Sequence, residues 1–228
     1  GRLWHLKAGK LSAVSGLPSD IVVKGQGGLL DVAFWTDPTT DSSWVYLTYS
    51  RLHPFDKDLS ATGLVRGVWH ETEDSVRLGT LETLFIATPY EKTHHHYGSR
   101  IAFGQDGMLY LTCGERGKRD IHPQTLTTRP GKVHRMHPDG SGLRSISRND
   151  VSEWFPVTSN TGHVLFTRWD YIDRHAVLHQ NLWAMRPDGT NQMALWGNGA
   201  PKPHWTFQLQ PGPGSYKPTF LPACLLST

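Results

Sequence analysis

Two kinds of glycine-containing turn each occur twice in the chain, and this repeat restricts the fold more than any other feature. The turn GQDG at Gly104–Gly107 precedes MLYLT, and the similar turn SNTG at Ser159–Gly162 precedes HVLFT. The turn HPDGSG at His137–Gly142 resembles RPDGTN at Arg186–Asn191. Glycine suits the positive φ that such a tight hairpin turn requires. The repeat predicts units of four strands each, joined alternately by a tight turn and a longer loop, which is typical of a β-propeller blade.

Short runs of Val, Leu, Ile, Phe, Trp and Tyr lie between Gly, Pro, Asp and Asn, and helical periodicity is scarce. This pattern indicates many short antiparallel strands and an all-β fold. At roughly 50 residues a blade, the chain supplies about four four-stranded units, which predicts a partial or open propeller. Exposed strand edges in such a propeller favour self-association. The expected strands are Leu29–Phe34, Trp44–Tyr49, Leu64–His70, Arg100–Phe103, Met108–Cys113, Lys132–His137, Val164–Trp169, Asn181–Arg186 and Met193–Trp196.

Composition excludes several classes of function. The 23 basic and 20 acidic side chains give a net charge of +3 without any basic run, which argues against a nucleic-acid partner. No apolar stretch approaches the length of a membrane span, so we expect no membrane insertion. Cys113 and Cys224 are far apart in the sequence, which excludes a zinc ribbon. The chain starts at Gly1 with GRLWHL, which resembles the middle of a strand and lacks an initiating Met, so we expect a fragment or a processed chain. It has no signal peptide, which by itself indicates nothing.

Five stretches of the first 141 residues carry a family resemblance. They are GRLW…GKLS (Gly1–Ser12), GLPSDIVVKGQGGLLDVAF (Gly16–Phe34), WVYLTYS (Trp44–Ser50), HHYGSRIAFGQDGMLYLTCGERG (His95–Gly117) and GKVHRMHPDGS (Gly131–Ser141). In this order they resemble the soluble PQQ-dependent aldose sugar dehydrogenases, the glucose/sorbosone dehydrogenase family. The stretches GQGGLLDVAF and H-x₃-R-x₃-G-x-DG are the specific ones.

The resemblance implies a six-bladed propeller that oxidises an aldose at C1 to the lactone, in the periplasm or outside the cell. It further implies PQQ as the hydride acceptor and a calcium ion that assists it. The histidine four residues before the arginine of the motif is the general base in this family, and that position is His96, followed by Arg100. An imidazole, whose pKa lies near 7, suits proton removal from a sugar hydroxyl. Gln26 matches a glutamine of the same pocket, and His95 stands where some members carry an acid.

Structural roles compete with these functional ones. Gln26 lies among glycines, so a tight turn explains it equally well. With Gln26 and His95, Arg100 is predicted to line the substrate and cofactor pocket as a ligand-binding cation, but an ion pair between blades is the more common role of such an arginine. Asp106 and Asp139 are expected to form turns by accepting hydrogen bonds from the backbone. No stretch after Ser141 matches the family's Arg/Asn-rich loop, its PQQ-binding Lys and Arg residues or its calcium loop. Without cations a tricarboxylated cofactor should bind poorly, which favours a non-catalytic propeller that serves as a binding module.

The second half of the chain resembles a different group. Leu143–Pro211 is similar to WD-like, Tol-type propeller repeats, and Asp150–Asn191 most resembles proteins related to the hydrazine synthase alpha subunit. No catalytic residue is transferred from that likeness. The predicted segments are therefore 1–141, similar to sugar dehydrogenases; 142–217, similar to WD-like repeats; and 218–228, a disordered tail. The junction lies near Asp139–Gly142.

A metal-binding propeller is the third possibility, because the chain contains 13 histidines. Consecutive histidines at 94–96 cannot all face one ion in an extended segment. His175 and His179 are four residues apart, as zinc ligands on a helix would be, but they lack the glutamate of the HExxH motif. Asp150, Asp170 and Asp173 show no calcium-loop pattern. No metal ligand is therefore predicted.

Overall fold

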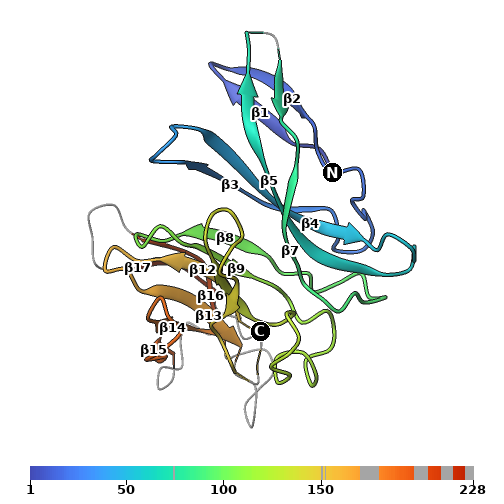
Figure 1. The fold of residues 1–228 in the computed structure, drawn as a ribbon. Coiled ribbons are helices and arrows are strands. Elements are labelled where there is room, and N and C mark those ends of the chain that lie inside the picture. The colour runs from blue at the N-terminus through green and yellow to red at the C-terminus, as the bar shows by residue number, and fades with distance from the viewer. Residues whose placement is uncertain are drawn as a thin grey trace. The chain divides into compact units, whose positions relative to one another are not determined.

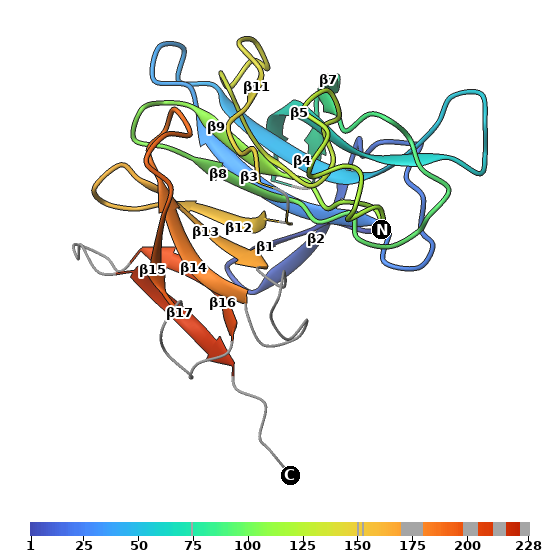
Figure 2. The same cartoon turned by 90° about the horizontal axis from the view of Figure 1, so that it is seen from below.

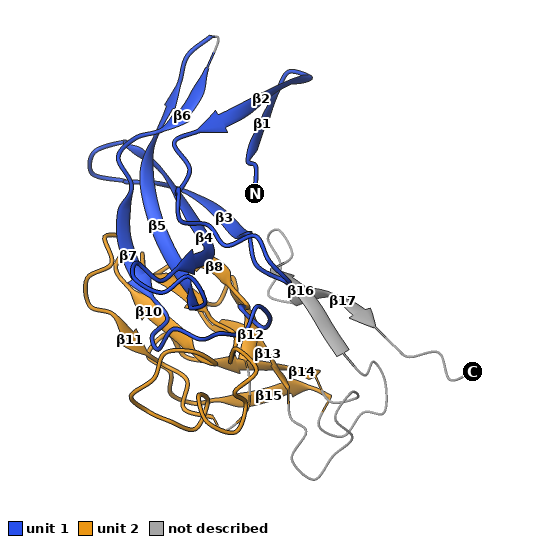
Figure 3. Ribbon diagram, turned by 90° about the vertical axis from the view of Figure 1, so that its right-hand side faces the viewer, with its two compact units in different colours: residues 1–97 blue, residues 98–228 orange. Residues whose placement is uncertain are grey.

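The computed structural model describes residues 1–73, 75–149, 151, 153–169 and 180–197, together with the backbone of two strands at 205–211 and 218–223. The described part contains strands, turns and loops and no helix. It therefore offers no helical segment long and apolar enough to cross a membrane. The chain forms two compact units, Gly1–Tyr97 and Gly98–Thr228 (Figure 3).

The first unit is a seven-stranded sheet in which β1, β2, β6, β5, β4 and β3 follow one another, and β7 pairs with β5 (Figure 1). Neighbouring strands are antiparallel except β2 and β6, which run parallel and pair Val14 with Val76. The strands are β1 (Trp4–Lys7), β2 (Lys10–Ser15), β3 (Leu29–Thr36), β4 (Ser43–Leu52), β5 (Ser60–Glu71), β6 (Val76–Leu78) and β7 (Glu82–Ile86).

Strand β4 forms the centre of the first unit, since its residues 45–50 are all buried. Val45, Leu47 and Tyr49 alternate along β4, and side chains at alternate positions share one face of a strand. They belong to the hydrophobic cluster that also contains Val14, Val65, Val76 and Leu78. The intervening positions include Thr48 and Ser50, both fully buried. The polar positions therefore lie on the other face of β4.

The second unit contains two four-stranded meanders. The first has the order β11-β10-β9-β8, and the second is built from β12, β13, β14 and β15, with β16 beside β14 and β17 beside β16 (Figure 2). The strands are β8 (Arg100–Phe103), β9 (Leu109–Thr112), β10 (Val133–Met136), β11 (Arg144–Ser145), β12 (Glu153–Thr158), β13 (Val164–Trp169), β14 (Gln180–Met185), β15 (Met193–Trp196), β16 (Trp205–Pro211) and β17 (Pro218–Ala223).

The repeated turns take the same conformation in both meanders. Gly107 and Gly162 have φ values of 73° and 78°, and Gly140 and Gly189 have values of 86° and 87°. The amides of Gly107 and Gly162 donate to the carbonyls of residues 104 and 159, at 3.0 and 2.9 Å. Two successive meanders with the same turns are the predicted propeller blades.

The aspartates of the first meander form turns, as predicted. Asp106 accepts a hydrogen bond from the amide of Met108 at 3.2 Å. Asp139 accepts from the amide and the hydroxyl of Ser141 at 2.9 and 2.6 Å. Asp106 also pairs with Arg135 at 2.9 Å. These carboxylates therefore have structural partners.

The predicted division at residues 141 and 217 rests on resemblance and stays a prediction. The division between compact units lies at residues 97 and 98. Strand β17 lies within the segment that was expected to be a tail. Self-association through strand edges also stays a prediction.

Replacing Leu47 by alanine should destabilise the first unit strongly. Leu47 is 1% exposed in the centre of the cluster, and a cavity left by leucine costs about 2–5 kcal/mol. Leu6→Ala is the matched control, since Leu6 is 68% exposed on β1. Chemical denaturation of both variants checks this, and equal losses would contradict the assignment of the core to β4.

Candidate functional site

Gln26 joins two loops that are about 70 residues apart in the sequence. Its backbone amide donates a hydrogen bond to the carbonyl oxygen of His94 at 2.8 Å. Its side-chain Oε1 accepts a hydrogen bond from the amide of His96 at 2.8 Å. The first loop precedes β3 and the second follows β7, and both belong to the first unit. Gln26 thus binds the backbone on both sides of His95, at His94 and at His96, the predicted base.

Glycines on each side of Gln26 allow this close approach. A Cβ atom on Gly25 would lie 2.4 Å from the carbonyl oxygen of His94, and Gly25 has a φ of +59°. A Cβ atom on Gly27 would lie 2.8 Å from Oγ of Ser50. The amide of Gly28 donates to the same Ser50 oxygen at 2.7 Å. Side chains at these positions would separate the loop from the histidines and from β4.

Tyr97 anchors the histidine loop to β5. Its side chain is 1% exposed, and its hydroxyl lies 2.7 Å from Oγ of Ser60. Its carbonyl oxygen accepts a hydrogen bond from Oγ1 of Thr62 at 2.8 Å. His96, the residue before Tyr97, is therefore fixed by Gln26 on one side and by Tyr97 on the other.

His96 has a left-handed backbone with φ of 51°, which few residues other than glycine adopt. Its ring packs edge to face on that of His95, with 4.7 Å between the ring centroids. Both histidines are exposed. Such a backbone persists only where neighbouring contacts enforce it, and it often marks a functional position.

The structure therefore brings three of the four predicted site residues, Gln26, His95 and His96, into one arrangement. Gln26 combines the two roles that the sequence left open, because it lies in a glycine turn and also binds the histidine loop. Arg100 begins β8 of the second unit, where it pairs with Thr112. The catalytic and pocket roles of these four residues stay predictions.

The side chains joined here are an amide and imidazoles. They include no carboxylate for calcium and no lysine or arginine for the carboxylates of PQQ. Within the described ranges, no group of three or more His, Cys, Asp and Glu residues could hold a metal ion. The arrangement suits a sugar hydroxyl and does not fit the cofactor with its metal. His175, His179, Asp150, Asp170 and Asp173 lie outside the described residues.

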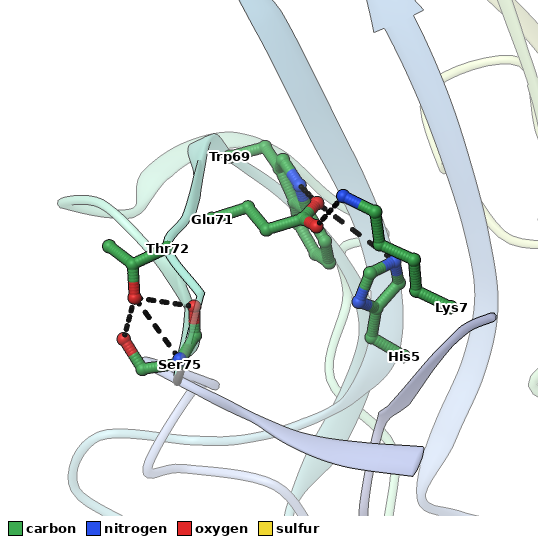
Figure 4. Close-up of polar contacts among 6 residues, drawn as sticks. All are labelled: His5, Lys7, Trp69, Glu71, Thr72 and Ser75. Carbon is green, nitrogen blue, oxygen red and sulfur yellow. Dashed lines mark hydrogen bonds and ion pairs between the residues drawn. The ribbon is translucent and has the colours of Figure 1, made fainter. Parts of the chain in front are cut away.

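A second polar group of the first unit links β1 to the end of β5 (Figure 4). Glu71 accepts hydrogen bonds from Lys7 at 2.6 Å and from the indole nitrogen of Trp69 at 3.2 Å, and His5 lies 4.0 Å away. The bond from Lys7, followed by that from Trp69, lowers the pKa of Glu71. Lys7 and Glu71 are already paired, so this contact serves to join β1 to the end of β5.

The second unit buries ionisable groups that the sequence analysis missed. Glu153, Lys132 and His134 are each 1% exposed. Burial raises the pKa of Glu153 to about 7 and lowers those of Lys132 and His134 to about 8 and 4. Asn149 donates a hydrogen bond to Glu153, and Arg168 donates to Asn149 at 3.1 Å. Alternation of apolar residues gives no signal for such positions, because the polar residues occupy inward-facing places of the strands.

Comparison with known proteins now identifies the family. The family model described as Glucose / Sorbosone dehydrogenase matches residues 1–152. The chain belongs to this family. The fold of this chain, all-β and part of a propeller, is similar to the fold of solved relatives. A glucose dehydrogenase has a TM-score of 0.64 and 22% identity, covering 82% of this chain and 59% of that chain.

Two comparisons concern aldose sugar dehydrogenases of Escherichia coli. The protein YliI of strain K12 is 35% identical over 142 residues, which are 61% of this chain and 36% of that protein. The soluble aldose sugar dehydrogenase in its apo form has a TM-score of 0.63 and 25% identity, covering 82% of this chain and 54% of that one. The chain thus spans about a third of the length of the curated relative it matches.

Removing the Gln26 side chain should release the amide of His96. In Gln26→Ala we expect amide hydrogen exchange at His96 to accelerate about fivefold, the equivalent of one hydrogen bond worth about 1 kcal/mol. Gln105→Ala, in the exposed turn of the second unit, is the control. Unchanged exchange at His96 would show that the Gln26 side chain does not stabilise the backbone there.

Burial of Glu153 should make stability fall with rising pH. Its pKa is about 7 in the folded chain against an ordinary 4.5, so the folded state binds more protons between these values. The free energy of unfolding should drop by about 3 kcal/mol from pH 4.5 to 7 through this group. Glu153→Gln should remove the drop, whereas Glu73→Gln, at an exposed position, should keep it. Denaturation at several pH values measures this, and parallel profiles for both variants would contradict it.

Proposed function

We propose that this protein oxidises an aldose at C1 to the lactone, with PQQ as the hydride acceptor. The observation that supports the proposal is the hold of Gln26 on the backbone of His96, within the motif that marks the family. Both are residues that the resemblance assigns to the sugar side of the pocket. The substrate is then a small sugar, and by the same likeness the protein acts in the periplasm or outside the cell.

In the proposed reaction, His96 removes the proton from the C1 hydroxyl. A fixed backbone is useful for this step, because a general base must lie within hydrogen-bond reach of its proton. Gln26 uses its Oε1 on the amide of His96, so its Nε2 has two N–H donors with which a sugar oxygen can be oriented. Oxidation also removes a hydride from C1, and the family likeness assigns its acceptance to PQQ. Gln26, His95 and His96 include no lysine or arginine to hold the carboxylates of that cofactor.

A binding module without catalysis is the second candidate. It is favoured by the absence of a carboxylate, lysine or arginine among the joined side chains of the site. In this case the exposed His95 and His96 would bind a sugar and leave it unchanged.

A titration with PQQ and calcium chloride, followed by glucose and an artificial electron acceptor, separates the two candidates. Saturable binding and sugar-dependent dye reduction are expected if the enzyme proposal is right. Absence of PQQ binding at micromolar concentration, with sugar binding retained, would leave the binding module.

His96→Ala should lower dye-linked oxidation by a factor of about 10² to 10⁴, the usual contribution of a general base. His137→Ala is the matched control, since His137 is exposed in the turn after β10 of the second unit. Turnover that survives in His96→Ala would remove this residue from the mechanism.

A further inference from the structure

We propose that the second unit has an anion-binding pocket for a phosphate group, beside its PDG turn at Arg186–Asn191 and independent of the proposed sugar site. A cavity of about 370 Å³ lies between the segment Arg144–Arg148 and the turn Asp188–Gln192. Arg144 and Arg148 are its two basic side chains. The remaining lining residues are Ser145, Ile146, Asp188, Gly189, Thr190 and Gln192.

Within the part of the chain that the structure describes, no acidic side chain pairs with either arginine. Both are exposed, and among the described residues neither forms an ion pair or a side-chain hydrogen bond. Asp188 is the carboxylate among the described residues that line the pocket, and its own turn engages it. It accepts from the amide and the hydroxyl of Thr190 at 2.9 and 2.7 Å. Two guanidinium groups with free donors are the side chains best suited to phosphate oxygens.

The wall that carries the arginines is fixed. Ile146 and Ser147 lie between them and are 5% and 1% exposed. The amide of Ile146 donates to the carbonyl of Val133 at 2.9 Å, and Oγ of Ser147 accepts from the amide of Val133 at 2.8 Å. Both arginines thus extend from an anchored backbone, which reduces the conformational entropy that binding would cost.

The opposite wall is attached to the first. A Cβ atom on Gly189 would lie 2.3 Å from the carbonyl oxygen of Ile146, so only glycine permits this approach. Asn149, the residue after Arg148, donates to Oε1 of Gln192 at 2.8 Å. Two separate contacts therefore hold the PDG turn against the arginine segment, and the pocket is formed before a ligand arrives.

The cavity of the first unit provides a contrast. Its volume is about 350 Å³, but its Lys7 is already paired with Glu71 at 2.6 Å (Figure 4). A ligand that binds Lys7 there would compete with Glu71, although Lys10 also lines this cavity. The arginine pocket requires no such exchange, and its hydroxyl and amide side chains can contact the oxygens of a phosphate ester.

Binding of inorganic phosphate and of glycerol 3-phosphate, measured by calorimetry at constant ionic strength, tests the proposal. Tighter binding of glycerol 3-phosphate would identify a phosphate ester as the ligand, and tighter binding of phosphate would identify the free anion. The double variant Arg144→Gln/Arg148→Gln should weaken either binding by about tenfold or more.

The control Arg2→Gln/Arg77→Gln removes the same charge from exposed positions of the first unit and should bind as the parent does. Equal weakening in both double variants would mean a general charge effect and would overturn the proposal, as would the absence of saturable binding. His96→Ala should leave phosphate binding unchanged, so this result is independent of the sugar-oxidation test.

Discussion

The buried hydroxyl of Ser50 is the contact on which the geometry of the candidate site depends. It accepts the amide of Gly28 at 2.7 Å and donates to the carbonyl of Val22 at 2.6 Å, so it joins both ends of the glycine loop to the central strand β4. The hydroxyl is buried, so losing either partner would leave an unsatisfied polar group away from water. Gln26 lies between those ends and reaches the histidine loop. The position of His96 is therefore set by the hydrophobic core through a chain of hydrogen bonds.

The blades of the second unit could be predicted from the sequence because their turns are local. A glycine with φ near +80° at Gly107 or Gly162 specifies a tight hairpin whatever lies elsewhere in the chain. The predicted strand Arg100–Phe103 is identical to β8, and Met108–Cys113 exceeds β9 by one residue at each end. Alternation and turns together thus predict that strands which follow one another in the sequence also pair in the sheet.

Contacts between distant segments could not be predicted in this way. Val14 pairs with Val76 in a parallel arrangement, and nothing in either short strand specifies its partner. The burial of Lys132 and Glu153 depends on where several strands meet, which hydrophobic periodicity does not encode. Gln26 and His96 were grouped only because they match one family's motifs, whereas the arginine pocket depends on a loop approach that Gly189 alone would not reveal.

In the proposed reaction, proton removal and hydride acceptance make demands on different residues. The groups that fix His96 (Gln26, Tyr97 and the hydroxyls of β4 and β5) all belong to residues 1–97. Proton removal by His96, as proposed, would use these contacts of the first unit, but a proton transfer alone oxidises nothing. Oxidation requires an acceptor for two electrons, and an acidic cofactor requires cations that the joined side chains lack. Base geometry and cofactor affinity therefore depend on different residues, so a variant can lose one and keep the other.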